Sequence, residues 1–363
     1  MAGVVVRRGL RVLKWLAIGL VALVALLLVV GAIWEQVSRA DEAKRYPPRG
    51  QIVDIGGRRF HLDCRGSGSP TVILESGLDI NGTLAWYKVQ DTIAKTTRVC
   101  SSDRAGIMWS DPPPHVQNGD HVAQDLHAAL SKAGIGGPLV LVGHSLGGPY
   151  IMNYTRQFGG DVAGLVFVDA SHPDQLDRLP APGKPRQSTA LPFAMRAVAA
   201  LSWAGVPRLM MSGSDEVPKE ISEARGAQIG RSLHGALAEG AALPVTLAQG
   251  GQLRTLGNRP IVVLTAMKPY PESVLKAQKM TPADGLAQQA RWKAMQDDEA
   301  RWSTRSRHQL VPDASHYIQI DRPDVVIRAV DEVVATVRAD AAKATEQNRA
   351  SVAALPPASG HVP

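Results

Sequence analysis

The sequence Gly143-His144-Ser145-Leu146-Gly147 matches the pattern G-x-S-x-G. Before it lies an apolar run, Pro138-Leu139-Val140-Leu141-Val142, which is typical of a buried parallel strand. After it, the segment from Gly148 to Tyr154 indicates the start of a helix. A strand that turns sharply into a helix leaves the residue at the turn strained and exposed above the sheet edge. The spacing therefore predicts that Ser145 is a nucleophile; the alternative is an ordinary glycine-rich turn.

Strand and helix patterns alternate on both sides of this turn. A hairpin is expected first, because Gly56-Gly57 between two strand-like segments supplies the positive φ angles of a two-residue turn. Further strands are expected over residues 71–74, 97–101, 138–142, 163–168, 260–265 and 309–311. Helices are expected over residues 84–94, 120–133, 286–304 and 323–342. This alternation predicts an α/β fold, with a mainly parallel sheet and helices on both faces.

The alternation is interrupted once. Residues 171–257 are rich in Pro, Gly, Ala and Met, which predicts a helical cap inserted before the penultimate strand, over the carboxyl edge of the sheet. The Leu, Met, Ala and Trp203 side chains of this cap indicate either an apolar substrate pocket or the cap's own core. Residues 51–170 and 258–342 form the expected core. The segment 343–363 has few large apolar residues and is expected to be disordered.

The N-terminal segment predicts a membrane anchor. Residues 15–34 are uncharged and mainly aliphatic, with a tryptophan at each end, and 20 helical residues span roughly 30 Å. The basic residues of segment 1–14 favour a cytoplasmic flank, so a single pass would place the rest of the chain outside the cytoplasm. Residues 35–50 would then be a polar tether. The alternative is a signal peptide cleaved near Ser38-Arg39-Ala40, which would give a secreted protein.

The charge and cysteine content narrow the functional classes. The net charge is +7, but the chain has no basic stripe and only 5% aromatic residues, so no nucleic-acid partner is expected. Cys64 and Cys100 each lie in or beside an expected strand, and outside the cytoplasm they could form a disulfide. The alternative is two small buried side chains. Neither cysteine has the spacing of a metal site.

A serine hydroxyl needs a nearby base to accept its proton. His316 follows the last expected strand, in the loop 312–316, at the sheet edge where Ser145 is expected. The His144 side chain should instead pack beneath the turn. The regular spacing of His115, His121 and His127 indicates surface residues rather than a metal site.

Taken with the loops Ser76-Gly77-Leu78, 102–106 and 314–316, the Ser145 turn resembles the α/β-hydrolase fold family, in particular its membrane-tethered or secreted bacterial branch. The resemblance covers about residues 50–342. It implies a serine–acid–histidine triad that needs neither a metal nor an organic cofactor. It also implies an oxyanion hole formed by the backbone N–H groups of Leu78 and Leu146, although the family more often has His-Gly where this chain has Ser76-Gly77.

The acid departs from the commonest family pattern. Most members carry it after the strand that follows the cap, but residues 265–272 contain no aspartate. Asp169 ends the strand before the cap, and some members take their acid from that position. The resemblance therefore implies Asp169 as the acid, with Asp174, Glu272 or no acid at all as alternatives. Asp169 could also merely cap the next loop.

These residues together predict a serine hydrolase that cleaves a carboxylic ester or related acyl bond of a small molecule through an acyl-enzyme. Two alternatives remain on the same fold: a small-molecule binding or receptor protein without turnover, and a cofactor-free haloperoxidase-like activity. A serine at the turn disfavours dehalogenase and epoxide-hydrolase chemistry, because related enzymes use an aspartate there. The natural substrate, protein partners and oligomeric state are not specified by the sequence.

Overall fold

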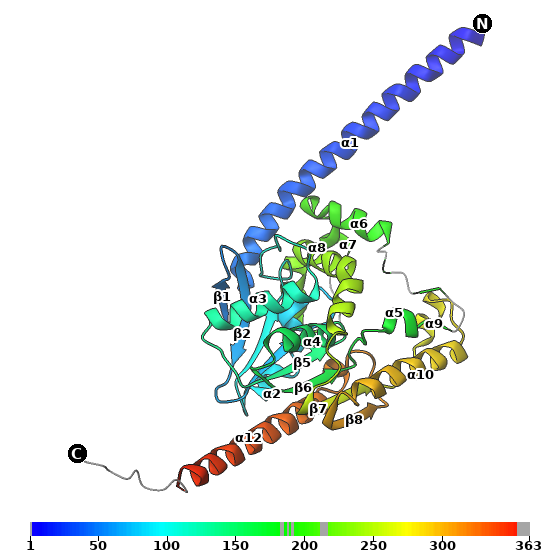
Figure 1. Cartoon of the computed structure of the whole chain (residues 1–363). Coiled ribbons are helices and arrows are strands. Elements are labelled where there is room, and N and C mark those ends of the chain that lie inside the picture. Colours follow the sequence, from blue (N-terminus) through cyan, green and yellow to red (C-terminus); the bar gives the residue numbers. More distant parts are fainter. Residues whose placement is uncertain (1, 182–184, 187–188, 190–191, 211–216, 354–363) are drawn as a thin grey trace.

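An eight-stranded sheet forms the body of the protein (Figure 1). The computed structural model describes residues 2–181, 185–186, 189, 192–210 and 217–353. The strand order is β1-β2-β4-β3-β5-β6-β7-β8, with β1 and β2 antiparallel to their neighbours and the other pairs parallel. The strands are β1 (Gln51–Asp54), β2 (Arg59–Arg65), β3 (Thr71–Glu75), β4 (Val99–Asp103), β5 (Leu139–His144), β6 (Val162–Val168), β7 (Gly257–Ala266) and β8 (Ser303–Val311).

Helices cover both faces of the sheet, as the alternation predicts. Successive side chains of a strand point to opposite faces, so Val140 and Val142 of β5 belong to one apolar cluster and Leu141 belongs to another. The first cluster lies under the helix α12 (Pro323–Ala353), together with the short elements η1 (Gly82–Trp86) and α2 (Gln90–Ile93). The second lies under α3 (Gly119–Lys132) and α4 (Gly147–Phe158).

Two sequence expectations for the core differ from the structure. The single helix expected over residues 84–94 is instead the 3₁₀ turn η1 followed by the one-turn helix α2. The last strand, expected over 309–311, already starts at Ser303, and the preceding helix α10 (Pro282–Glu299) ends before it. β8 is an edge strand with half-exposed polar side chains, so it lacks the apolar run that identifies a buried strand.

The cap elements between β6 and β7 are helical. They are α5 (Gln175–Arg178), α6 (Phe193–Ala200), η2 (Ser202–Ala204), α7 (Val206–Met210) and α8 (Lys219–Gly250). The long helix α8 packs on α3 and α4. Parts of the expected cap, residues 182–184, 187–188, 190–191 and 211–216, lie outside the described residues. A further helix, α9 (Glu272–Ala277), precedes α10.

The N-terminal helix α1 (Ala2–Arg45) contains the segment 15–34 and is long and apolar enough to cross a membrane. Residues 35–45 of the expected tether are helical, because α1 continues through them. Extending an existing helix adds one hydrogen bond per residue without a new nucleation cost. In addition, the buried side chain of Glu35 is paired with Arg39 and with Arg208 of α7, which holds this part of α1 against the cap.

The expected disorder of the C-terminal segment is also wrong in part. α12 continues to Ala353, so residues 343–353 are helical, while residues 354–363 lie outside the described residues. Ala, Lys, Glu, Gln and Arg have high helix propensity, and the helix is already nucleated by its packing on the sheet. A lack of large apolar residues therefore indicated exposure here rather than disorder.

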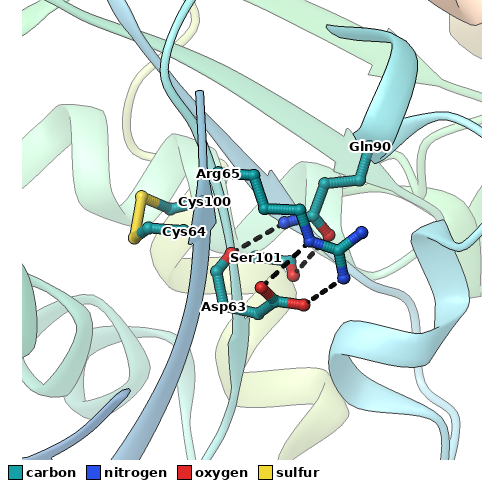
Figure 2. Close-up of a disulfide and its surroundings, with 6 residues drawn as sticks. All are labelled: Asp63, Cys64, Arg65, Gln90, Cys100 and Ser101. Carbon is teal, nitrogen blue, oxygen red and sulfur yellow. Dashed lines mark hydrogen bonds and ion pairs between the residues drawn. A yellow bond between two sulfur atoms is a disulfide. The ribbon is translucent and has the colours of Figure 1, made fainter. Parts of the chain in front are cut away.

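Cys64 and Cys100 form a disulfide between β2 and β4, the pairing that the sequence left open (Figure 2). The two residues lie directly opposite each other in the antiparallel register, with their Cα atoms 4.0 Å apart. On the other side of the same strands, Gln90 donates a hydrogen bond to the backbone oxygen of Asp63 (2.7 Å) and accepts one from Ser101 (2.9 Å). These bonds tie both strands to α2.

Candidate active site

Ser145 lies in the turn between β5 and α4 with φ of 53°. A positive φ is uncommon for a residue other than glycine, and strained backbone of this kind concentrates at functional sites. Glycines make the turn possible: a Cβ atom on Gly143 would lie 2.5 Å from the backbone oxygen of Gly147, and one on Gly147 would overlap the backbone oxygen of Glu75. The local backbone is the one that the G-x-S-x-G pattern predicts.

Asp169 follows β6 and is hydrogen-bonded to His316. The Nδ1 atom of His316 lies 2.6 Å from Oδ2 of Asp169. The other carboxylate oxygen accepts hydrogen bonds from the backbone N–H of Ala266 and from the indole N–H of Trp292, both at 2.9 Å. A carboxylate oxygen accepts, so Nδ1 of His316 is the donor, and Nε2 is the ring nitrogen that does not contact Asp169. The buried Asp169 thus fixes both the orientation and the tautomer of the imidazole.

The loop that carries His316 lies against the Ser145 turn. The Nε2 atom of His144 lies 2.9 Å from the backbone oxygen of His316, and the two imidazole rings are 4.8 Å apart. Burial, together with the nearby His316 ring, holds the pKa of His144 well below its ordinary value. A neutral His144 therefore donates from Nε2 to that carbonyl. The contact by which His144 positions the loop of His316 was not predicted from the sequence.

The early loop after β3 approaches Ser145 from the other side. A Cβ atom on Gly77 would lie 2.8 Å from Cβ of Ser145, so only glycine fits at this contact. Leu78 follows Gly77, and Leu146 follows Ser145. Within the described part of the chain, the backbone N–H groups of Leu78 and Leu146 donate no hydrogen bond to another protein group. Two backbone amides without an acceptor in the described part of the chain therefore belong to the Ser145 turn and to the loop that contacts it.

A buried charge cluster holds this early loop in place. Arg104 donates to the backbone oxygens of Ser76 (2.9 Å) and Gly77 (2.6 Å). Its guanidinium also binds both carboxylate oxygens of Glu239 in α8, at 2.7 and 2.9 Å, and lies 3.4 Å from Glu75. The loop is thus tied to the cap through Arg104. Glu239 could not be found from the sequence, because it lies 135 residues from its partner and belongs to no local motif.

Two carboxyl groups, one beside the Arg104 cluster and one near Asp169, have raised pKa values. Burial raises the pKa of Asp79, next to Leu78, to about 6. One of its oxygens accepts from the backbone N–H of Asn81 at 2.6 Å, and the other has no partner among the described residues. On the Asp169 side, burial and the negative charges of Asp169 and Asp298 raise the pKa of Glu299 well above its ordinary value.

The two alternative acids have other partners. Asp174 forms an ion pair with Arg254 (2.6 Å), and Glu272 forms an exposed pair with Lys276 (2.8 Å). Of the three candidates, Asp169 is the carboxylate that contacts His316. Across the described ranges, no group of three His, Cys, Asp or Glu side chains is arranged to hold a metal ion.

A cavity of about 300 Å³ opens beside Asp169 and His316. Its lining combines aromatic, apolar and polar side chains, among them His316, Asp169, Tyr270, Trp292, Lys268 and Gln288. Trp203, expected in a pocket or in the cap's core, lies instead on the surface of the cap with 49% of its area exposed. Trp292 was missed because its indole reaches Asp169 from 123 residues away, and nothing near it in the sequence marks that contact.

Comparison with known proteins identifies the family. The sequence profile of the alpha/beta hydrolase family matches residues 26–329. The chain belongs to this family. One curated relative, the uncharacterized protein YbdG of Bacillus subtilis, is 27% identical over 166 residues, which are 46% of this chain and 51% of that protein. An uncharacterized vacuolar membrane protein of Saccharomyces cerevisiae is 32% identical over 123 residues, 32% of this chain and 19% of that protein. The chain thus spans about half or less of the length of these curated relatives.

Solved structures share the fold of this chain at low sequence identity. A thermophilic esterase from Thermogutta terrifontis has a TM-score of 0.56 at 20% identity, over 79% of this chain and 99% of that one. A mutant protein from Pseudomonas aeruginosa, provisionally described as an epoxide hydrolase, has a TM-score of 0.58 at 20% identity, over 79% and 96% of the two chains. These similarities establish the alpha/beta hydrolase architecture.

Proposed function

We propose that this protein is a serine hydrolase that cleaves a carboxylic ester or a related acyl bond. Ser145 would be the nucleophile, His316 the general base and Asp169 the acid that orients the base. The observation that carries the proposal is the 2.6 Å hydrogen bond from His316 to Asp169, in a loop that lies against the strained Ser145 turn.

In the proposed reaction, Oγ of Ser145 attacks the substrate carbonyl while its proton moves to Nε2 of His316. Asp169 stabilises the resulting imidazolium through the bond to Nδ1. The carbonyl oxygen becomes an oxyanion, which the backbone N–H groups of Leu78 and Leu146 would stabilise, each by about 3 kcal/mol. Neither group has an acceptor among the described residues, which supports this role. The imidazolium then protonates the leaving group, and water releases the acid from the acyl-enzyme.

The site geometry favours this reading over a receptor without turnover. The main argument for a receptor is the missing aspartate after the strand that follows the cap. The contact of His316 with Asp169 weakens this argument, because it offers a carboxylate from the strand before the cap. The fold neighbour from Thermogutta terrifontis is named an esterase, which agrees with acyl chemistry on this architecture. The cavity beside His316 has room for a small-molecule ester.

We also infer that α1 anchors the hydrolase in a membrane in a single pass, with the catalytic domain outside the cytoplasm. The basic flank before the apolar segment supports this orientation. The Cys64–Cys100 disulfide supports it independently, because disulfides persist in oxidising compartments. The Saccharomyces cerevisiae relative is named a vacuolar membrane protein.

A fluorophosphonate probe tests the nucleophile directly. The purified full chain should be labelled covalently, and Ser145→Ala should abolish the labelling and lower kcat on p-nitrophenyl esters by about 10⁴-fold or more. Ser131→Ala, an exposed serine of α3, is the matched control and should be labelled like the unchanged protein. A folded protein that reacts neither with the probe nor with esters of any acyl length would contradict the proposal and favour a receptor.

A further inference from the structure

Three neighbouring cap elements expose large apolar side chains. Phe193 and Met195 of α6, Trp203 of η2 and Leu209 and Met210 of α7 are all exposed, Leu209 by 68%. Because the three elements contact one another, we name these five residues the apolar cap face. Monomeric soluble proteins rarely leave a large apolar surface of this kind open to water.

The apolar cap face is fixed to the N-terminal helix. A Cβ atom on Gly31 of α1 would lie 2.6 Å from the backbone oxygen of Ala204, and one on Gly205 would lie 2.8 Å from the ring of Trp34. Arg208 of α7 binds Glu35 at 2.8 Å. Residues 31–35 of α1 therefore pack closely against η2 and α7.

These contacts set the level of the face along α1. Gly31 precedes Trp34, the last residue of the apolar segment 15–34, by three residues, or roughly 4.5 Å along the helix axis. Ala204 touches Gly31, so its neighbour Trp203 lies at the level of the last apolar turn. Glu35, which pairs with Arg208, follows Trp34 directly in α1, so charged side chains start where the apolar segment ends. Figure 1 shows α6 and α7 where α1 leaves the body, with α10 on a different side of the molecule.

We propose that the apolar cap face lies in the interfacial region of the same bilayer that holds α1. This inference rests on the proposed membrane anchoring. Tryptophan is enriched at the level of the lipid headgroups, and amphipathic segments bury their apolar side roughly 5–10 Å into this region. The hydrolase would then face the lipid with its cap, and the Arg104–Glu239 contact would connect the membrane-bound cap to the loop beside Ser145.

Lipid quenching of a site-specific fluorophore tests the proposal in the full chain. Leu209→Cys, Leu20→Cys and Leu286→Cys are each labelled with an environment-sensitive dye, since both native cysteines are in the disulfide. The proteins are reconstituted in phosphatidylcholine vesicles with and without a lipid that carries a nitroxide near the top of its acyl chain. Leu286 of α10 is the matched control, because it is 60% exposed but outside the apolar cap face.

The expected result is strong quenching at positions 20 and 209, by about twofold or more for an interfacial dye, and none at position 286. Quenching at 20 but not at 209 would overturn the cap inference and leave the membrane anchor intact. A lack of quenching at 20 would overturn both. If the emission of the dye at position 209 changes only at high protein density, and the nitroxide lipid does not quench it, a second copy of the chain covers the apolar cap face. That result would also overturn the cap inference. Met210→Cys replaces Leu209→Cys if that variant does not fold.

Discussion

Two groups of ionisable side chains lie at the carboxyl edge of the sheet, and they differ in their contact with solvent. In the first, Asp169 is buried but the His316 side chain is 41% exposed beside the cavity. In the second, Arg104, Glu75 and Glu239 are all at most 2% exposed. An imidazole that reaches solvent can meet a substrate, whereas a fully buried ion pair can only hold the backbone around it in place. Exposure thus distinguishes a pair suited to catalysis from a cluster that supports it.

The largest expected effect comes from the first group. Asp169→Asn should lower kcat on p-nitrophenyl esters by about 10⁴-fold while the fold is retained, because an amide no longer selects the Nδ1–H tautomer of the base. Asp174→Asn is the control, since Asp174 is paired with Arg254 and does not contact His316. Unchanged turnover in Asp169→Asn, or the loss appearing in Asp174→Asn instead, would show that another carboxylate serves His316.

The second group should respond mainly in stability. Arg104→Met leaves Glu75 and Glu239 buried without their counter-charge, which should lower the free energy of unfolding by about 3–5 kcal/mol. Adding Glu239→Gln should recover part of this loss, because one uncompensated charge is removed. Thermal unfolding of the detergent-solubilised chain measures both. If Arg104→Met alone unfolds at the same temperature as the unchanged protein, Arg104 is dispensable for holding the cap and the loop.

The sequence could predict the parts of the site that rest on local patterns. The Ser145 turn is encoded by adjacent residues, and His316 was expected because it follows a strand at the same sheet edge. Asp169 was expected from the resemblance to a known family. Whether Cys64 and Cys100 pair depends on which strands are neighbours, and only the order β1-β2-β4 places them opposite each other.

What the sequence could not predict depends on contacts between distant segments. Trp292 and Glu239 reach the site from α10 and α8, and no local pattern marks either contact. The same holds for Glu35: a charged residue after an apolar segment suggests a solvated tether, but Arg208 buries it in the continuing helix. These misses share one cause, because the partner of a polar group determines whether burial is tolerated.

The smallest expected effect concerns the carboxyl group beside the Arg104 loop. Burial raises the pKa of Asp79 to about 6 from an ordinary value of 3.8, so the folded state binds the proton more tightly than the unfolded state. The stability contributed by the proton is therefore present below about pH 4 and is lost as pH rises through about 6. Asp79→Asn keeps an oxygen for the backbone N–H of Asn81 and removes the titration.

At pH 7, Asp79→Asn should raise the free energy of unfolding by about 3 kcal/mol, given ~1.4 kcal/mol for each unit of pKa shift. Melting temperatures of the variant and the unchanged protein should converge near pH 4 and separate as pH rises through 6. Asp111→Asn provides a control of opposite sign, because hydrogen bonds from Arg59 lower the pKa of Asp111, so its contribution is lost as pH falls. If Asp79→Asn raised the free energy of unfolding equally at pH 4 and pH 7, the gain would come from altered packing. The pKa of Asp79 would then be that of a carboxyl group in water.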